Sequence, residues 1–260
     1  MNQKMPKKQR IILRKKKRIR NFLRFITFII LIVACSIFAF VSPIFNIKEI
    51  EVENNDFLSK DTIISLSELS TEQNIFKINK NSIARKIETN AYVENVKIKR
   101  KLPNKIILEI TERNRDYNVE FLNGYAYINK QGYILEISEQ KCENIPILKG
   151  ILTPSENIVA GSRLDEKDLL KLETVIEIMS ISKNYEIDSK ITSIDITDEN
   201  NFILYIEEEK KEIYLGDKTN LSSKILYIPT ILSENKGKEG TIYLNGNVND
   251  GFQPRFREKV

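Results

Sequence analysis

The sequence predicts an α+β protein with one N-terminal transmembrane helix, a small β-α-α-β-β domain and a mixed β-sheet domain with two helices. Three observations predict it: a long run without charge near the N-terminus, alternating apolar residues at many places after it, and helical apolar stripes between them. We expect a basic cytoplasmic segment at 1–24, a transmembrane helix at 25–44, domains at 45–113 and 114–248, and a short flexible tail at 249–260.

The membrane helix at 25–44 is predicted from the run Phe25–Ile47, where 23 consecutive residues carry no charge. A helix needs about 20 apolar residues to cross the hydrocarbon core of a bilayer. A cleaved signal peptide is the alternative, but its apolar region is usually about 7–15 residues and ends in small residues. The segment Phe38-Ala-Phe40 followed by Val41-Ser-Pro43 is a poor cleavage site, so we expect the helix to be retained.

The charge distribution predicts the orientation of this helix. Eleven Lys and Arg and no acidic residue precede Phe25. Residues 25–260 therefore contain the remaining 30 of the 41 basic residues and all 36 acidic ones, which gives them a net charge of −6. Basic residues beside a span are retained in the cytoplasm. We therefore expect a single-pass protein of the cell membrane with a cytoplasmic N-terminus and extracytoplasmic domains. A basic arm can also bind nucleic acid, but beside a span it more often contacts anionic lipid.

The composition restricts the chemistry of the exported part. The chain has no His, which excludes Ser-His-Asp and Cys-His catalysis and His-ligated zinc. Cys35 lies in the predicted span and Cys142 lies outside it, so we expect no intramolecular disulfide and no Cys-rich metal site. We predict no catalytic residue, no cofactor, no metal, no small-molecule substrate and no nucleic-acid partner.

The first domain is predicted from alternation and caps. Ile50 and Val52 lie on one face of a half-buried strand, and Val96 and Ile98 on one face of another. Between them, Ser59 to Asp61 offers helix caps and Asn79 or Asn81 opens a second short helix. A turn at 102–105 and a returning strand at 106–112 complete the order β-α-α-β-β.

These residues resemble a POTRA domain, and their detailed pattern resembles the FtsQ/DivIB family of cell-division proteins. The matching stretches are Ile47-Lys-Glu-Ile-Glu-Val52, Asn74-Ile-Phe-Lys-Ile78, Tyr92 to Arg100, Leu102-Pro-Asn104 and Ile107-Leu-Glu-Ile-Thr-Glu-Arg113. Where the family usually continues with Pro-x-Ala, this chain has Asn114-Arg-Asp-Tyr117. Without the resemblance, the rhythm would indicate only a β-hairpin with a basic outer face.

The second domain is predicted as strands and two helices. Two strands are expected within 124–137 around a turn at Gly132. A short edge segment is expected at Ile145–Gly150, because Pro146 disfavours a central strand. Further strands are expected at 191–196, 202–206, 211–216 and 240–245. Asp165 is expected to cap a helix with a buried stripe of Leu169, Leu172, Ile176 and Met179. A second helix starts near Asn220, with Leu221, Ile225 and Ile228 inward, and Pro229 should kink or end it. This order resembles the β domain of the same family.

Two motifs could carry chemistry. Ser180-Ile-Ser-Lys183 matches the Ser-x-x-Lys of penicillin-binding enzymes, but no Ser-Asp-Asn or Lys-Thr-Gly follows, and a Lys is expected at a helix C-terminus anyway. Glu207-Glu-Glu209 is most simply a solvated turn. We therefore predict binding rather than catalysis.

The predicted partner-binding site is the last strand of the second domain. If it lies at the edge of the sheet, its unpaired backbone groups can pair with a strand of another chain. Its residues are Thr241, Ile242, Tyr243, Leu244 and Asn245, with Ile242 and Leu244 toward the core. The alternatives are an ordinary solvated edge, or an edge covered by the tail through Phe252.

The family resemblance implies a non-enzymatic, membrane-anchored scaffold of the divisome that acts at the division septum. It implies that the β domain receives the extracytoplasmic segments of FtsB/DivIC-like and FtsL-like proteins, and that the POTRA domain contacts other divisome members. The alternatives are a membrane-anchored Ser/Lys hydrolase, and a POTRA-type transport or assembly protein unrelated to division.

Overall fold

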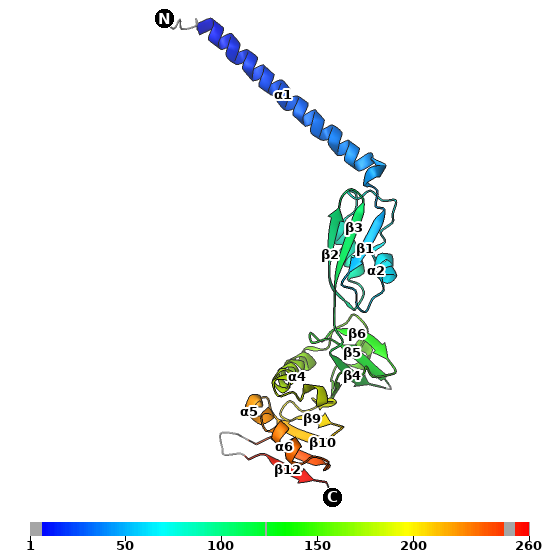
Figure 1. Cartoon of the computed structure of the whole chain (residues 1–260), viewed down its shortest axis with the longest axis vertical. Coiled ribbons are helices and arrows are strands. Elements are labelled where there is room, and N and C mark those ends of the chain that lie inside the picture. Colours follow the sequence, from blue (N-terminus) through cyan, green and yellow to red (C-terminus); the bar gives the residue numbers. More distant parts are fainter. Residues whose placement is uncertain (1–6, 123, 247–252, 260) are drawn as a thin grey trace. The chain divides into compact units, whose positions relative to one another are not determined.

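The computed structural model describes residues 7–122, 124–246 and 253–259, with side chains from Lys16 onward (Figure 1). The described chain forms two compact units. The first contains the residues up to Ile87 together with Val96–Ile110, and the second contains Glu88–Asn95 together with the residues from Thr111 onward. The strand β2 therefore begins in one unit and ends in the other.

The N-terminal helix α1 spans Lys7–Val41 and is followed by the short 3-10 helix η1, Pro43–Phe45. Its part from Lys16 to Val41 is the one helix in the described residues that is long and apolar enough to cross a membrane. Its apolar side chains are largely exposed, Phe25 and Phe28 to 60% each, and none of its most apolar stretch is buried inside the described structure. A helix that is apolar around its whole circumference is stable only in an apolar surrounding.

The POTRA-like part of the first unit has the predicted order β-α-α-β-β. Its elements are β1 Glu49–Glu53, α2 Lys60–Ser67, α3 Lys80–Ile87, β2 Val93–Lys101 and β3 Lys105–Glu112, and the strand order is β1-β3-β2 with β1 parallel to β3.

The caps and the strand register of this part are as predicted. Ser59 caps α2 by accepting a hydrogen bond from the backbone N–H of Thr62 at 3.1 Å. Asn79 caps α3 by accepting a hydrogen bond from the backbone N–H of Ser82 at 3.2 Å. Val96 and Ile98 are buried.

The second unit is a mixed sheet with helices. The strands are β4 Tyr117–Phe121, β5 Gly124–Ile128, β6 Ile134–Ser138, β7 Ile147–Lys149, β8 Ser193–Asp195, β9 Phe202–Ile206, β10 Lys211–Gly216, β11 Gly240–Tyr243 and β12 Arg255–Glu258. Among the described residues the order is β12-β11-β10-β9-β8-β7-β4-β5-β6, so β12 and β6 are the two edges. Gly132 has the predicted positive φ, 79°, in the turn between β5 and β6.

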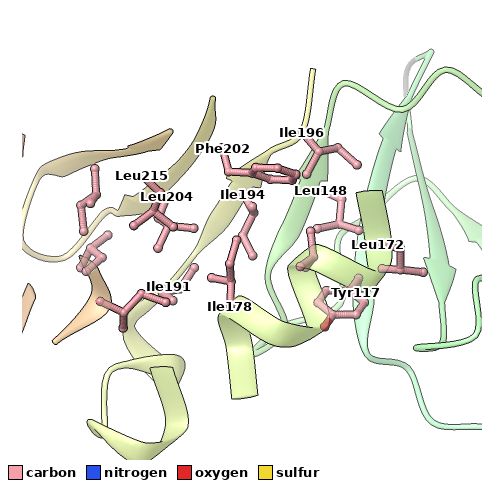
Figure 2. Packing of buried hydrophobic residues seen from close by; sticks show 14 of the residues in the cluster. Tyr117, Leu148, Leu172, Ile178, Ile191, Ile194, Ile196, Phe202, Leu204 and Leu215 are labelled. Atoms are coloured by element: carbon pink, nitrogen blue, oxygen red, sulfur yellow. The ribbon is translucent and has the colours of Figure 1, made fainter. Parts of the chain in front are cut away.

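The helices of this unit are α4 Glu166–Asn184, α5 Leu221–Ile225 and α6 Ile228–Glu234, with 3-10 turns η2 Ser155–Asn157 and η3 Asp188–Lys190. Leu172 and Ile178 of α4 point into the same apolar cluster as Leu148, Ile194 and Leu204 of the sheet (Figure 2).

The second predicted helix is interrupted, in agreement with Pro229. The helix α5 ends at Ile225, and Pro229 lies in the first turn of α6, where its missing N–H costs no hydrogen bond.

The buried stripe of α4 differs from the prediction. Leu172, Val175 and Ile178 are fully buried, whereas Leu169, Ile176 and Met179 are only partly buried beside the cluster. The cause is the burial of polar residues on this helix. The carboxylate of Asp168 is fully enclosed and draws the N-terminal turn of α4 toward the loop at Leu152, so the buried face is rotated from the purely apolar stripe.

The prediction that Ile145–Gly150 is an edge segment of the sheet is wrong. The strand β7 is central, because it pairs in parallel with both β4 and β8. Pro146 does not prevent this, since it lies just before the strand and its carbonyl oxygen accepts a hydrogen bond from the N–H of Asn118 at 2.9 Å. The strand β4, which the sequence analysis did not predict, occupies the other side of β7.

Candidate partner-binding edge

The predicted edge segment is not the edge of the sheet in this structure. Gly240–Tyr243 forms β11, and Arg255–Glu258 pairs with it antiparallel as β12, with Ile242 opposite Phe256 and Tyr243 opposite Arg255. The expectation of a flexible tail at 249–260 is therefore wrong for 255–258, whereas residues 249–252 and 260 lie outside the described residues. Ile242 and Leu244 face the core as predicted, and Thr241 and Tyr243 are half-buried on the opposite face.

A single aromatic side chain holds β12 against the apolar core. Phe256 packs against the main apolar cluster, and the ammonium of Lys211 lies 5.3 Å from the centre of its ring. The Lys211 side chain is itself buried, and its Nζ donates hydrogen bonds to the carbonyl oxygens of Glu209, at 2.9 Å, and Lys238. A buried ammonium is tolerated here because it has acceptors and an aromatic face.

Two ion pairs and a backbone bond hold one end of β12. Lys238 pairs with Glu258 at 3.3 Å, and Lys259 pairs with Glu239 at 2.9 Å. The backbone N–H of Lys259 also donates to the carbonyl oxygen of Glu239 at 2.9 Å. The hydrogen bond from Lys259 lowers the pKa of the Glu239 carboxyl. These side chains are exposed, so the ion pairs align the strand more than they stabilise it.

The opposite face of this edge carries tyrosines and arginines. The rings of Tyr243 and Tyr214 stack with centres 5.5 Å apart, and the guanidinium of Arg255 lies 6.0 Å from the centre of Tyr243. Tyr205 and Tyr214 both approach the Glu212 carboxylate, at 3.3 and 3.2 Å. Burial and the nearby Glu212 raise the pKa of Tyr205 to about 12.

A surface hollow of about 440 Å³ lies beside this edge, lined by Tyr205, Glu212, Thr241 and Lys259 among others. Aromatic and arginine side chains are enriched where proteins bind one another. The edge and its aromatic face together are therefore the candidate site. The sequence analysis missed β12; the signal it offered was the alternation Arg255-Phe256-Arg257, with one apolar residue between charges.

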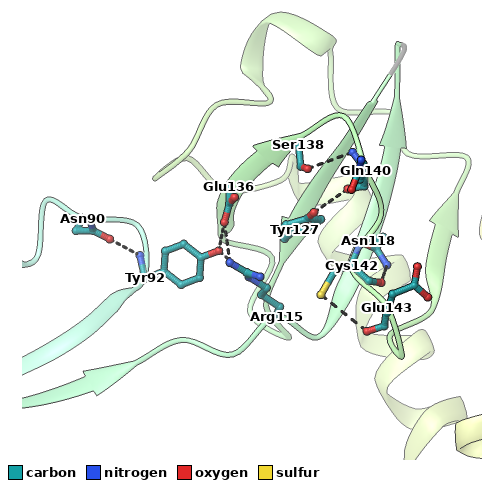
Figure 3. A network of polar contacts seen from close by, with 10 residues as sticks. All are labelled: Asn90, Tyr92, Arg115, Asn118, Tyr127, Glu136, Ser138, Gln140, Cys142 and Glu143. Atoms are coloured by element: carbon teal, nitrogen blue, oxygen red, sulfur yellow. Dashed lines mark hydrogen bonds and ion pairs between the residues drawn. The ribbon is translucent and has the colours of Figure 1, made fainter. Parts of the chain in front are cut away.

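A second polar network lies at the start of the second unit (Figure 3). The hydroxyl of Tyr92 donates to Glu136 and accepts from Nε of Arg115 at 2.7 Å, and Arg115 also pairs with Glu136 at 2.8 Å. Burial, and then the hydrogen bond to Glu136, raises the pKa of Tyr92.

A buried amide anchors the neighbouring loop. Asn118 accepts from the backbone N–H of Cys142 at 2.7 Å and donates to the carbonyl oxygens of Cys142 and Ile145. Both this amide and the Tyr92 network are satisfied within the protein, which indicates a structural role.

The residues considered for chemistry are not assembled into a site. Ser180 and Lys183 are both exposed on α4, and no hydrogen bond joins them in the part of the chain that the structure describes. Glu207–Glu209 forms the turn between β9 and β10, closed by a bond from the N–H of Lys210 to the carbonyl oxygen of Glu207 at 3.0 Å. Among the described residues, no group of three or more His, Cys, Asp or Glu side chains could hold a metal ion.

An apolar N-terminal helix, a β-α-α-β-β domain and a mixed sheet with an aromatic edge define a membrane-anchored α+β protein. Comparisons with known proteins give the family. A family model described as "POTRA domain, FtsQ-type" matches residues 45–113, and one described as "FtsQ/DivIB, C-terminal related" matches residues 119–243.

Two curated relatives are similar over most of the chain. Cell division protein DivIB of Clostridium tetani (strain Massachusetts / E88) is 30% identical over 216 residues, which cover 82% of this chain and 79% of the relative. Cell division protein DivIB of Clostridium botulinum (strain Hall) is 32% identical over 187 residues, 71% of each chain. A solved extracytoplasmic domain of DivIB from Geobacillus stearothermophilus aligns with 15% identity and a TM-score of 0.30, over 47% of this chain and 93% of that one.

The chain belongs to the FtsQ/DivIB family of cell division proteins. Its α+β architecture has an apolar helix, a POTRA domain and a mixed sheet, and the two family models match the last two of these parts. It is a component of the division machinery that interacts with other division proteins, and one N-terminal helix anchors it in the membrane where division proteins act, at the septum.

Proposed function

We propose that this chain is a non-enzymatic scaffold of the divisome that holds the extracytoplasmic parts of other division proteins together during septum formation. The observation that carries the proposal is the strand β12. Within the described sheet it has a neighbour on one side only, and it lies beside the aromatic face of Tyr243 and Tyr214. Such an edge can accept an added strand through backbone hydrogen bonds.

The proposed partners are small bitopic division proteins of the FtsB/DivIC-like and FtsL-like kinds. The segment predicted to bind them, Thr241–Asn245, begins in β11, the second strand from this edge, and its half-buried side chains Thr241 and Tyr243 contribute the face of the site. The added strand of the partner would form its backbone hydrogen bonds with the side of β12 that faces away from β11. Arg255 and Arg257 are exposed there and suit an acidic partner segment.

The proposed orientation places the N-terminus in the cytoplasm. It rests on the eleven basic residues before Phe25 and the net negative charge after it. Protease added to intact, wall-stripped cells should then digest the region beyond Ser42 and spare the basic segment. Protection of the region beyond Ser42, while known surface proteins are digested, would contradict this orientation.

The scaffold proposal is tested by recovering the full-length protein from crosslinked membranes of dividing cells and by imaging a fluorescent fusion. We expect bitopic division proteins in the recovered complex and fluorescence at the septum. Absence of both would contradict the proposal. Labelling by a serine-reactive probe that is lost on Ser180→Ala would instead support the hydrolase alternative.

A further inference from the structure

The last turn of α1 is joined to the loop between α2 and α3. Nδ2 of the buried Asn74 donates to the carbonyl oxygen of Ala39 at 3.0 Å, while its Oδ1 accepts from the N–H of Phe76 at 2.9 Å. Carbonyl groups at the end of a helix have no partner within the helix, and here Asn74 supplies one. The ring of Phe76 lies 6.0 Å from that of Phe40 and 5.2 Å from that of Phe45.

The length of the apolar run places this junction at the surface of a bilayer. Val41, the end of α1, lies 17 residue steps after Arg24, the last basic residue before the span, a rise of about 26 Å. The hydrocarbon core is about 30 Å thick. The uncharged run continues through η1 to Ile47. The hydrocarbon boundary therefore falls near Phe45, where Phe76 makes its contacts.

The turn between β2 and β3 lies at the same end of the domain. The carbonyl oxygen of Asn104 accepts from the N–H of Lys48 at 2.8 Å, only a few residues after η1. In this turn Leu102 is 57% exposed, and in η1 Ile44 is 56% exposed. Exposed apolar patches mark surfaces that contact other proteins or membranes.

Exposed lysines accompany these apolar side chains. Lys48, Lys77 and Lys101 are all exposed and adjoin η1, Phe76 and Leu102 along the chain. Among the described residues, the acidic side chains of this end are Glu72, which is exposed, and Glu49 and Glu51, which pair with Lys105 at 2.9 and 2.7 Å. An apolar tip flanked by lysines is suited to the interface of a membrane with anionic lipid headgroups.

We propose that this membrane-proximal end of the POTRA domain, formed by Ile44, Phe76 and Leu102 with Lys48, Lys77 and Lys101, docks on the phospholipid bilayer that α1 spans. Ile44 and Leu102 enter the interface, and the lysines contact phosphate headgroups. The inference rests on anchoring by α1, and it does not depend on the partners proposed for the sheet edge. The domain is then held on the membrane surface instead of moving freely on a tether.

The absence of Trp from the sequence makes a direct test possible. Three single-tryptophan variants of the full-length protein are reconstituted into vesicles of phosphatidylcholine and phosphatidylglycerol. Leu102→Trp reports the docking end, Phe28→Trp reports the span, and Phe57→Trp is the matched control, because Phe57 is 46% exposed and follows the end of β1 remote from α1. Ile44→Trp replaces Leu102→Trp if that variant does not fold.

We expect Leu102→Trp to lose emission with lipids brominated near the headgroup, and Phe28→Trp with lipids brominated near the chain end, while Phe57→Trp is unchanged. Replacing Lys48, Lys77 and Lys101 by Gln should reduce the quenching of Leu102→Trp in anionic vesicles. Quenching of Phe28→Trp alone would overturn the docking proposal and leave the anchor in place. If no variant is quenched, both the docking proposal and the membrane anchor are overturned. Neither of these two outcomes bears on localisation at the septum.

Discussion

The ring of Phe256 lies directly over Gly240 of the neighbouring strand. A β-carbon placed on Gly240 would come within 2.7 Å of two ring carbons and would also collide with the carbonyl oxygen of Arg257. Ordinary side-chain carbons do not approach so closely, so the glycine is what allows the aromatic ring to reach the core. The position of β12, and with it the edge of the sheet, depends on this pair.

Gly240→Ala should therefore displace β12 while the rest of the sheet stays folded. The backbone oxygen of Arg257 cannot rotate away as a side chain can, so the strand itself must move. We expect a loss of roughly 1–3 kcal/mol in the free energy of unfolding, as for other overpacked sites. Hydrogen exchange of the Arg255–Glu258 amides should become faster. Thr241→Ala, on the opposite face of the same strand, should leave that exchange unchanged, and equal exchange in both variants would contradict the role of Gly240.

Ile98→Asp should unfold the POTRA domain. Ile98 is 8% exposed in β2 and faces the helices and sheet of the first unit, so the new carboxylate would be buried without a partner, at a cost of several kcal/mol. Lys97→Asp is the matched control, because Lys97 is exposed on the other face of the same strand. The check is thermal melting of both variants. If the two melt alike, the register of β2 is wrong by one residue.

Asp168→Asn should destabilise the second unit. The Asp168 carboxylate is fully buried and accepts from the N–H of Leu152, and from both the N–H (2.6 Å) and the hydroxyl (2.6 Å) of Thr153. An amide offers one acceptor oxygen and turns an NH₂ group toward these donors, so we expect a loss of about 1–3 kcal/mol in urea unfolding. Asp165→Asn, at the helix N-cap but without a side-chain capping bond, should change little. A larger effect at Asp165 would contradict this assignment.

Tyr92→Phe should reduce the alkaline sensitivity of the protein. Burial and the hydrogen bond to Glu136 raise the pKa of folded Tyr92 above the value of about 10 that it has when unfolded. Between these two pKa values the unfolded chain binds fewer protons, so the free energy of unfolding falls as the pH rises above about 10. Urea unfolding as a function of pH should show a shallower fall for the variant. Parallel curves for wild type and variant would contradict the raised pKa.

Local patterns predicted much of this fold. The alternation at Val96 and Ile98, the caps at Ser59 and Asn79, the turn at Gly132 and the interruption before Pro229 depend on residues close in the chain, and the structure has them as predicted. The family pattern in the first domain added the order of the elements.

The rest depends on contacts between distant residues. Arg255-Phe-Arg-Glu258 has one apolar residue, and it becomes a strand because Gly240 leaves space for Phe256. The strand β7 is central because Pro146 stands outside it and β4 supplies its second neighbour. The buried face of α4 is rotated because the Asp168 carboxylate binds the loop at Leu152, which lies 16 residues earlier in the chain. Gly240 and Phe256, β4 and β7, and Leu152 and Asp168 are each distant in sequence, so local patterns alone do not show that they meet.

Binding of partners at the β12 edge can be examined by photo-crosslinking in dividing cells. A photoreactive phenylalanine analogue is placed at Arg257 of β12 or, as the matched control, at Ile137 of β6, the opposite edge of the same described sheet; both positions are exposed. The proposed binding mode predicts crosslinks to small bitopic division proteins from position 257 and none from position 137. Crosslinks from position 137 alone would contradict it.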